Sequence, residues 1–283
     1  MRDTFEMEAD MTPTQQLRDA LGVASDYVLP AAEVERLRSE LKHIKPLLML
    51  FTPRTGSTYL GHELHRTQAG CFLEEWFNWY SIPEEKTAEQ ETLYDYFIDK
   101  VHRYTTESNL FGIKFTWPQF LAINEIVPIS SLFSNPITWL SLRRRNIVAQ
   151  AISVNIADQT QIFHSFQIAA ERDRNLSKVL YDQDTICETI EFLIFQETAL
   201  DKWLAQNNAS PLNIFYEDLV EDSESTVRAI MSKLGVEPHP AWPASLGPNP
   251  CNKLEPELNL KFEARFRNEN DAFIKSIEAK RQL

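Results

Sequence analysis

Residues 47–60 read LLMLFTPRTGSTYL, and this stretch indicates the fold. Its first five residues are apolar and follow a proline, which is typical of a short β-strand buried on both faces. A loop over 52–57 comes next, and a helix is predicted to begin near Thr58. A strand, a glycine-containing turn and a helix in this order predict the start of a β–α–β unit.

Other short segments have the same strand character and alternate with helical patterns. Strands are predicted at 112–116, 137–142 and 212–216, where β-branched or aromatic residues are concentrated. Helices are predicted at 12–22, 31–43, 87–104, 146–157, 163–172, 185–207, 223–234 and 267–281. The alternation predicts an α/β fold with a mostly parallel central sheet and helices on both of its faces. Residues 1–45 are predicted to form an N-terminal helical extension.

Composition limits the classes of partner. The chain has 283 residues, of which 43% are hydrophobic, so it can build a real core. It carries 41 acidic against 28 basic residues, a formal net charge of −13, which argues against a nucleic-acid or anionic-membrane partner. Neither a secretory leader nor an apolar run of about 20 residues is found. A cytoplasmic protein is therefore expected. Its oligomeric state is open, a homodimer included.

The three cysteines do not indicate a disulfide framework. Cys71, Cys187 and Cys251 are odd in number and have no paired spacing. They indicate neither a set of disulfides nor a zinc site, and no other metal cluster is predicted.

The loop between the first strand and its helix has the features of an anion site. The backbone N–H groups of a first helical turn lack intrahelical partners and lie at the positive end of the helix dipole. Gly56 would let a phosphate approach closely, while Ser57 and Thr58 add hydroxyls and Arg54 adds a planar charged fork. An ordinary turn capped by Ser57 is the alternative.

This loop differs from the loop that binds nucleoside triphosphates. That motif requires Gly-x-x-x-x-Gly-Lys-[Ser/Thr]. Phe51 stands at the position of the first glycine and Ser57 at that of the lysine. The loop is poorly suited to a magnesium-bound triphosphate but suits a single 5′-phosphate.

A second basic segment follows the strand predicted at 137–142. Residues 143–145 are three arginines at the carboxyl end of that strand, the edge where open α/β sheets bind ligands. Arg145 and Ser153 are eight residues apart, so both side chains are predicted to face one phosphate. A solvated basic turn that pairs with carboxylates is the alternative.

Together these segments resemble the sulfotransferases that use 3′-phosphoadenosine 5′-phosphosulfate (PAPS). More narrowly, the chain resembles the bacterial trehalose 2-sulfotransferase-like group. The segments that carry the resemblance are 53–60, 73–77, 144–153 and 216–219, with a weaker one at 111–117. They occur in the right order between residues 47 and 235. The resemblance implies a P-loop-like three-layer domain, here residues 46–283, and transfer of a sulfuryl group without a metal.

The resemblance also implies which residues bind PAPS. The residues implied to bind the 5′ end of the donor are Arg54, Thr55, Gly56, Ser57 and Thr58. Those implied to bind its 3′-phosphate are Arg145 and Ser153. Tyr216 closes the strand predicted at 212–216 and is a candidate for contacting the adenine or ordering the loop beneath it. A structural role for this segment, with Glu217 or Asp218 as a cap, is the alternative.

The catalytic base implied by the resemblance is Glu75, within the Glu-Trp-Phe segment. Glu74 is its immediate rival, but adjacent side chains generally point in different directions, so only one is expected to serve. Many sulfotransferases use a histidine instead, which keeps His62, His65 and His164 as alternatives. Arg54 would stabilise the charge that develops on the leaving phosphate, and Lys114, at a strand end, is a further candidate cation, with a peripheral salt bridge as the alternative.

The acceptor is expected to be a small molecule. Candidate acceptor-binding residues are Glu74, Trp76, Phe77, Trp79 and His164. The resemblance favours the hydroxyl of a carbohydrate, whereas acidic and aromatic side chains together also suit a cationic natural product sulfated on an amine or carbamoyl nitrogen. A P-loop small-molecule kinase and a non-catalytic nucleotide-binding protein are the alternative functions.

Overall fold

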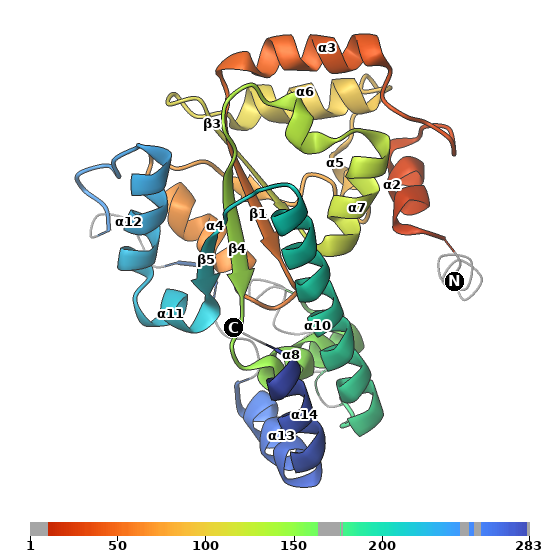
Figure 1. Ribbon diagram of the computed structural model, residues 1–283, viewed down its shortest axis with the longest axis vertical. Helices are drawn as coiled ribbons and strands as arrows, with labels where there is room; N and C mark the ends of the chain where they lie inside the picture. The colour runs from red at the N-terminus through yellow and green to blue at the C-terminus, as the bar shows by residue number, and fades with distance from the viewer. Residues whose placement is uncertain (1–10, 164–175, 177, 244–248, 252–255, 282–283) are drawn as a thin grey trace.

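A computed structural model describes residues 11–163, 176, 178–243, 249–251 and 256–281. Its centre is a five-stranded sheet in the order β2-β3-β1-β4-β5, in which all neighbouring pairs are parallel (Figure 1). The strands are β1 Lys45–Phe51, β2 Leu73–Glu74, β3 Leu110–Phe115, β4 Thr138–Arg143 and β5 Leu212–Phe215. The predicted α/β fold with a parallel sheet between helices is confirmed.

The central strand β1 is buried on both faces, as its apolar run predicts. Successive side chains of a strand point to opposite faces of the sheet. Leu48 and Leu50 accordingly belong to one hydrophobic cluster, and Leu47, Met49 and Phe51 belong to another. One strand thus joins two cores.

The face that Leu48 and Leu50 contact is covered by N-terminal and middle helices. These elements are α2 Pro13–Leu21, α3 Ala31–Glu40, α5 Ile82–Glu85, α6 Leu93–Tyr104 and α7 Trp117–Ile126, with 3₁₀ turns at Leu41–His43 and Ile129–Leu132. Leu17 and Leu37 of the N-terminal extension lie in the same cluster as Leu48. From residue 11 on, the extension therefore shares the core of the main domain.

The opposite face and the carboxyl ends of the strands have their own helices. On the opposite face lie α4 Ser57–Arg66, α11 Tyr216–Glu221 and α12 Ser223–Leu234. Beyond the carboxyl ends lie α8 Ile147–Thr160, α13 Pro256–Glu269, α14 Asp271–Lys280 and the first half of α10 Gln183–Gln206, whose apolar side chains form a third cluster (Figure 1). The second half of α10 runs back along the sheet, and its Leu200 and Leu204 belong to the same cluster as Leu48. No helix of the described ranges is long and apolar enough to cross a bilayer.

Two predicted helices differ from the structure. The helix predicted at 87–104 begins only at Leu93, because Thr92 and Asp95 form a capping box there. The single helix predicted at 267–281 is wrong: α13 ends before Asn270 and α14 starts after it, so that Phe266 and Ile274 both reach the third cluster. From residue 164 on, the helix predicted at 163–172 lies outside the described residues.

The topology brings two loops together. β1 lies between β3 and β4, so the loops after β1 and β4 leave neighbouring strands at the same edge of the sheet. The chain order reverses at this point, which is where open α/β sheets bind their ligands.

Candidate active site

The loop at residues 52–56 after β1, the predicted anion site (the phosphate loop), has an unusual backbone. Arg54 and Gly56 both have positive φ, 64° and 83°, the left-handed region that side chains other than glycine adopt rarely. The Thr55 hydroxyl donates to the carbonyl of Thr52 at 2.8 Å and is fully buried. Thr55 therefore shapes the loop from inside rather than facing a ligand.

The N-terminus of α4 is suited to an anion. Gly56 is its N-cap residue, and within the described chain no side chain caps the helix. The amides of the first turn, from Ser57 on, thus keep their capacity to donate to a ligand, and the helix dipole favours a negative one.

Gln150 of α8 holds this loop in place. It is fully buried, and its amide donates to the Thr52 hydroxyl at 2.8 Å and to the Pro53 carbonyl at 2.7 Å. Gln150 is 98 residues from Thr52, a separation that carries no local signal, so the sequence alone does not reveal this role.

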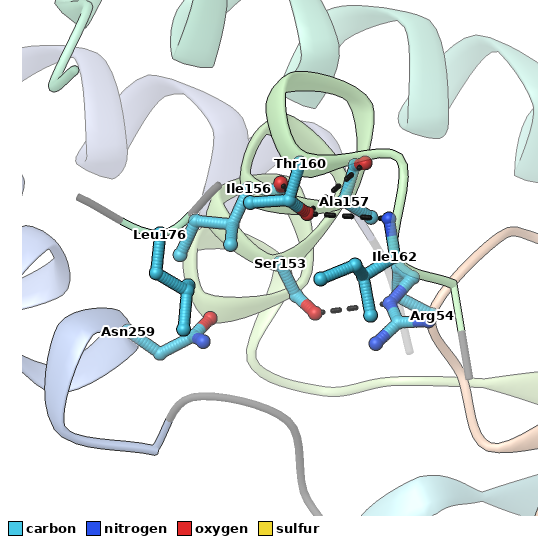
Figure 2. Close-up of a pocket in the computed structure, with 8 residues that line it drawn as sticks. All are labelled: Arg54, Ser153, Ile156, Ala157, Thr160, Ile162, Leu176 and Asn259. Atoms are coloured by element: carbon cyan, nitrogen blue, oxygen red, sulfur yellow. Dashed lines mark hydrogen bonds between the residues drawn. The ribbon is translucent and has the colours of Figure 1, made fainter. Parts of the chain in front are cut away.

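Arg54 lies against Ser153 of α8. Its Nε donates to the Ser153 hydroxyl at 3.0 Å, and Figure 2 shows the two side chains pointing toward each other across a small cavity. Burial lowers the pKa of Arg54, and the neighbouring Arg144 guanidinium lowers it further. Two half-buried guanidinium groups therefore lie close together, and a bound anion would reduce the repulsion between their positive charges.

The arginine loop after β4 gives each of its three side chains a different partner. Arg143 pairs with Asp201, and Arg144 lies over the Tyr216 ring, 4.7 Å from its centroid. Arg145 makes a two-pronged pair with Asp218 at 2.5 and 2.7 Å. Since Ser153 contacts Arg54 instead, the structure does not bring Arg145 and Ser153 onto a common partner.

The N-terminus of α8 differs from that of α4 because it is capped. Glu217 accepts the backbone N–H groups of Arg145 and Asn146 at 3.0 and 3.1 Å, and the Asn146 side chain accepts that of Ala149 at 3.0 Å. Glu217 thus caps α8, a helix distant in the chain, whereas the sequence suggested a cap for the turn that follows Glu217 itself. The anion-binding capacity of this loop rests on its side chains.

Tyr216 supports the phosphate loop from beneath. A Cβ atom added to Gly56 would lie 2.8 Å from the Tyr216 ring, so the glycine is needed for this packing as well as for its positive φ. Arg144 covers the ring and also donates to the Arg54 carbonyl at 3.4 Å. Arg144 is therefore a further candidate donor-site residue. The spacing to Ser153 indicated Arg145 and not Arg144.

Lys114 links the phosphate-loop helix to the two glutamates. Its ammonium lies 3.5 Å from the Thr58 hydroxyl, 3.4 Å from a Glu74 carboxylate oxygen and 3.8 Å from a Glu75 oxygen. Its side chain is only 2% exposed. A charge so deeply buried needs such partners, so Lys114 takes part in a central ion pair rather than a peripheral one.

Both glutamates lie toward Lys114, so the premise that these adjacent side chains point in different directions does not hold. Glu74 ends the short strand β2, and the chain turns directly after it. The alternation of a continuing strand therefore does not apply to Glu75.

Glu75 is held in a defined orientation. One of its carboxylate oxygens accepts from the Gln119 amide at 2.9 Å and from Asn78 at 3.4 Å, while the other lies toward Lys114. Gln119 is itself fixed, because its carbonyl oxygen accepts the Thr116 N–H at the start of α7. Like Gln150, Gln119 was not identified from the sequence.

A cavity of about 650 Å³ opens beside these groups, a size typical of small-molecule sites. Thr58, Glu75 and Lys114 belong to its lining. One side is aromatic: Tyr104 lies 5.7 Å from Phe72 and 4.5 Å from Trp76, measured between ring centroids.

The predicted acceptor residues separate into two sets. Glu74 and Trp76 line the cavity, and the Trp76 indole donates to the Gly112 carbonyl at 2.9 Å. Phe77 is 1% exposed and stacks on Phe115, and Trp79 packs against the same core cluster, so neither lines the cavity. His164 lies outside the described residues.

Of the three alternative histidines, His62 and His65 lie on α4. His62 lines the cavity, and burial lowers its pKa. His65 contacts the edge of Phe72. Among the residues described, no group of three or more His, Cys, Asp or Glu side chains is arranged to hold a metal.

Known proteins share the region that contains these features. Residues 47–269 match the family described as Stf0 sulphotransferase. The chain is also 23% identical over 261 residues to a trehalose 2-sulfotransferase of Mycobacterium tuberculosis, with 78% of this chain and 95% of that protein covered. The matched range extends from within β1 to the end of α13 and contains the phosphate loop, Glu75, Lys114 and the arginine loop. On this match over most of its length, the chain belongs to the Stf0 sulfotransferase family.

Proposed function

We propose that this sulfotransferase moves a sulfuryl group from PAPS to a hydroxyl of a neutral, sugar-like small molecule. The observation that carries this is the position of Lys114, whose buried ammonium contacts both Thr58 on the phosphate-loop helix and Glu75 on the wall of the cavity. A donor-binding loop and a carboxylate base thus meet at one cation.

The donor end fits a phosphosulfate. The uncapped first turn of α4 offers backbone donors, with Ser57 and Thr58 beside them, and Arg54 and Arg144 supply positive charge next to the loop. For the 3′-phosphate we propose Arg145 and Ser153. Arg145 would exchange the carboxylate of Asp218 for the phosphate, which suits the same planar fork.

The chemistry assigns one role to each group. Glu75 takes the proton of the acceptor hydroxyl as its oxygen forms a bond to sulfur, and the bond between sulfur and the 5′-phosphate oxygen breaks. Arg54 and the amides of α4 stabilise the charge that moves onto the phosphate, with Lys114 nearby. The products are a sulfate ester and adenosine 3′,5′-bisphosphate.

The charges of the cavity favour a neutral acceptor over a cationic one. Glu74 and Glu75 are already paired with Lys114, and Glu85 is paired with Lys100 at 2.6 Å. One ammonium does not compensate both Glu74 and Glu75. Arg103 also lines the cavity, however, so the described lining carries three carboxylates and three cations and offers a cationic acceptor no net negative charge. The aromatic side of the cavity suits the apolar face of a sugar ring, and the mycobacterial relative is named for trehalose, a neutral disaccharide.

A transfer assay tests the proposed function. The protein is incubated with ³⁵S-labelled PAPS and EDTA, together with either neutral disaccharides and glycosides or the matched amino sugars. We expect labelled products from neutral acceptors and at least about tenfold less from amino sugars. Phosphate transfer from magnesium-ATP with no transfer from PAPS would support the kinase alternative instead.

A further inference from the structure

Helix α14 lies outside the region that matches the family, yet it reaches the arginine loop. Arg281, its C-cap residue, donates from one guanidinium nitrogen to the carbonyl of Arg145 at 2.7 Å and from another to the carbonyl of Arg144. Figure 1 shows α14 beyond the carboxyl ends of the strands. A residue far along the chain thus holds the backbone of the predicted donor loop.

The same guanidinium is anchored in the protein interior. Arg281 pairs with Glu197 of α10 through two contacts, 2.8 Å from Nε and 2.7 Å from Nη2. The two side chains are only 6% and 5% exposed. Buried pairs with two parallel hydrogen bonds fix orientation well, so Arg281 forms a rigid link between α10, α14 and the loop.

The backbone of the arginine loop is therefore held from two sides: a carboxylate accepts its N–H groups, and a guanidinium donates to its carbonyl groups. The carboxylate of Glu217 accepts the amides of Arg145 and Asn146, while the guanidinium of Arg281 donates to the carbonyls of Arg144 and Arg145. Together these contacts set the direction of the backbone between β4 and α8. They also fix the positions of the Cα atoms from which the side chains of Arg144 and Arg145 extend.

We propose that Arg281, anchored by Glu197, is a positioning residue for the donor site. It fixes the arginine loop so that the enzyme distinguishes a nucleotide with a 3′-phosphate from one without. This inference rests on the proposed function. Arg281 acts through the carbonyls of Arg144 and Arg145, so its removal affects selectivity for the 3′-phosphate rather than the chemistry at sulfur.

Calorimetric titration of full-length variants tests this role. Arg281→Ala is expected to weaken the binding of adenosine 3′,5′-bisphosphate by about tenfold or more, with a change below about threefold for 5′-AMP. Glu197→Gln, which keeps the shape of the anchor and one acceptor oxygen, should shift the ratio of the two affinities in the same direction. The matched control is Lys275→Ala, because Lys275 lies on α14 in an exposed pair with Asp271 and should change neither affinity.

Each result has a defined meaning when thermal unfolding shows the variants to be folded. If Arg281→Ala does not fold, the ratio measured for Glu197→Gln decides the question. Equal weakening of both nucleotides in the folded variant, or no weakening of either, would overturn the positioning role while leaving the proposed function intact. A wild-type protein that does not prefer the bisphosphate would overturn both.

Discussion

Replacing Glu75 with Gln is expected to lower kcat for sulfuryl transfer by about 10²–10⁴-fold, the usual loss when a general base is removed. Glutamine keeps the size of the side chain but cannot take up the proton of the acceptor hydroxyl. Because Glu75 contacts Lys114 and Gln119 rather than the phosphate loop, donor affinity should change by less than about threefold. Steady-state transfer and calorimetry on the same preparation measure the two quantities.

The matched control is His62→Asn. His62 lines the same cavity, and burial lowers its pKa, which favours the neutral imidazole that a base requires, so it is a rival base beside Glu74. We expect its removal to reduce kcat by less than about tenfold. The opposite pattern, with a large loss for His62→Asn and little for Glu75→Gln, would assign the base to His62.

Gly56→Ala is expected to reduce kcat/KM by about 10²-fold, because the loop must move to accommodate a single methyl group. The φ of Gly56 is 83°, and the new Cβ would lie 2.8 Å from the Tyr216 ring, a distance that real Cβ atoms essentially never show. Relief of this contact displaces either the first amides of α4 or the ring beneath them. Transfer kinetics and donor titration check the result.

Gly235→Ala is the control that distinguishes the strain of a positive φ from the contact between a new Cβ and Tyr216. Gly235 also has a positive φ, 65°, but no atom of the described residues lies within 4 Å of the position that a Cβ would take there. The substitution should cost about 1–2 kcal/mol of stability in urea unfolding with no change in kcat/KM. Equal losses of activity in both variants would contradict the role given to the contact between Gly56 and Tyr216.

The sequence predicted those parts of the fold that depend on local patterns. β1 was identified from five consecutive apolar residues, and α12 was predicted at its observed bounds because Gly235 ends it in the left-handed conformation. β2 was missed since it has two residues, too few for any periodicity, and α7 was missed because its apolar residues do not gather on one face. The break at Asn270 depends on packing against α8 and α10, which no local pattern reports.

The candidate site divides in the same way. The phosphate loop is a local strand–turn–helix geometry and could be found from six residues. Gln119, Gln150 and Arg281 act on groups that are 44, 98 and 136 residues away along the chain, so their roles appear only in three dimensions. The spacing of Arg145 and Ser153 could not reveal that Asp218 and Arg54 contact these two side chains.

Calorimetric titration with adenosine 3′,5′-bisphosphate, with and without magnesium and with 5′-AMP as the comparison, tests the central claim most directly. If the loops after β1 and β4 bind PAPS, the bisphosphate binds with micromolar affinity regardless of magnesium, depends on its 3′-phosphate, and weakens by about tenfold or more in Arg145→Ala. Absence of binding, or equally tight binding of 5′-AMP, would contradict the assignment of these loops to the sulfuryl donor.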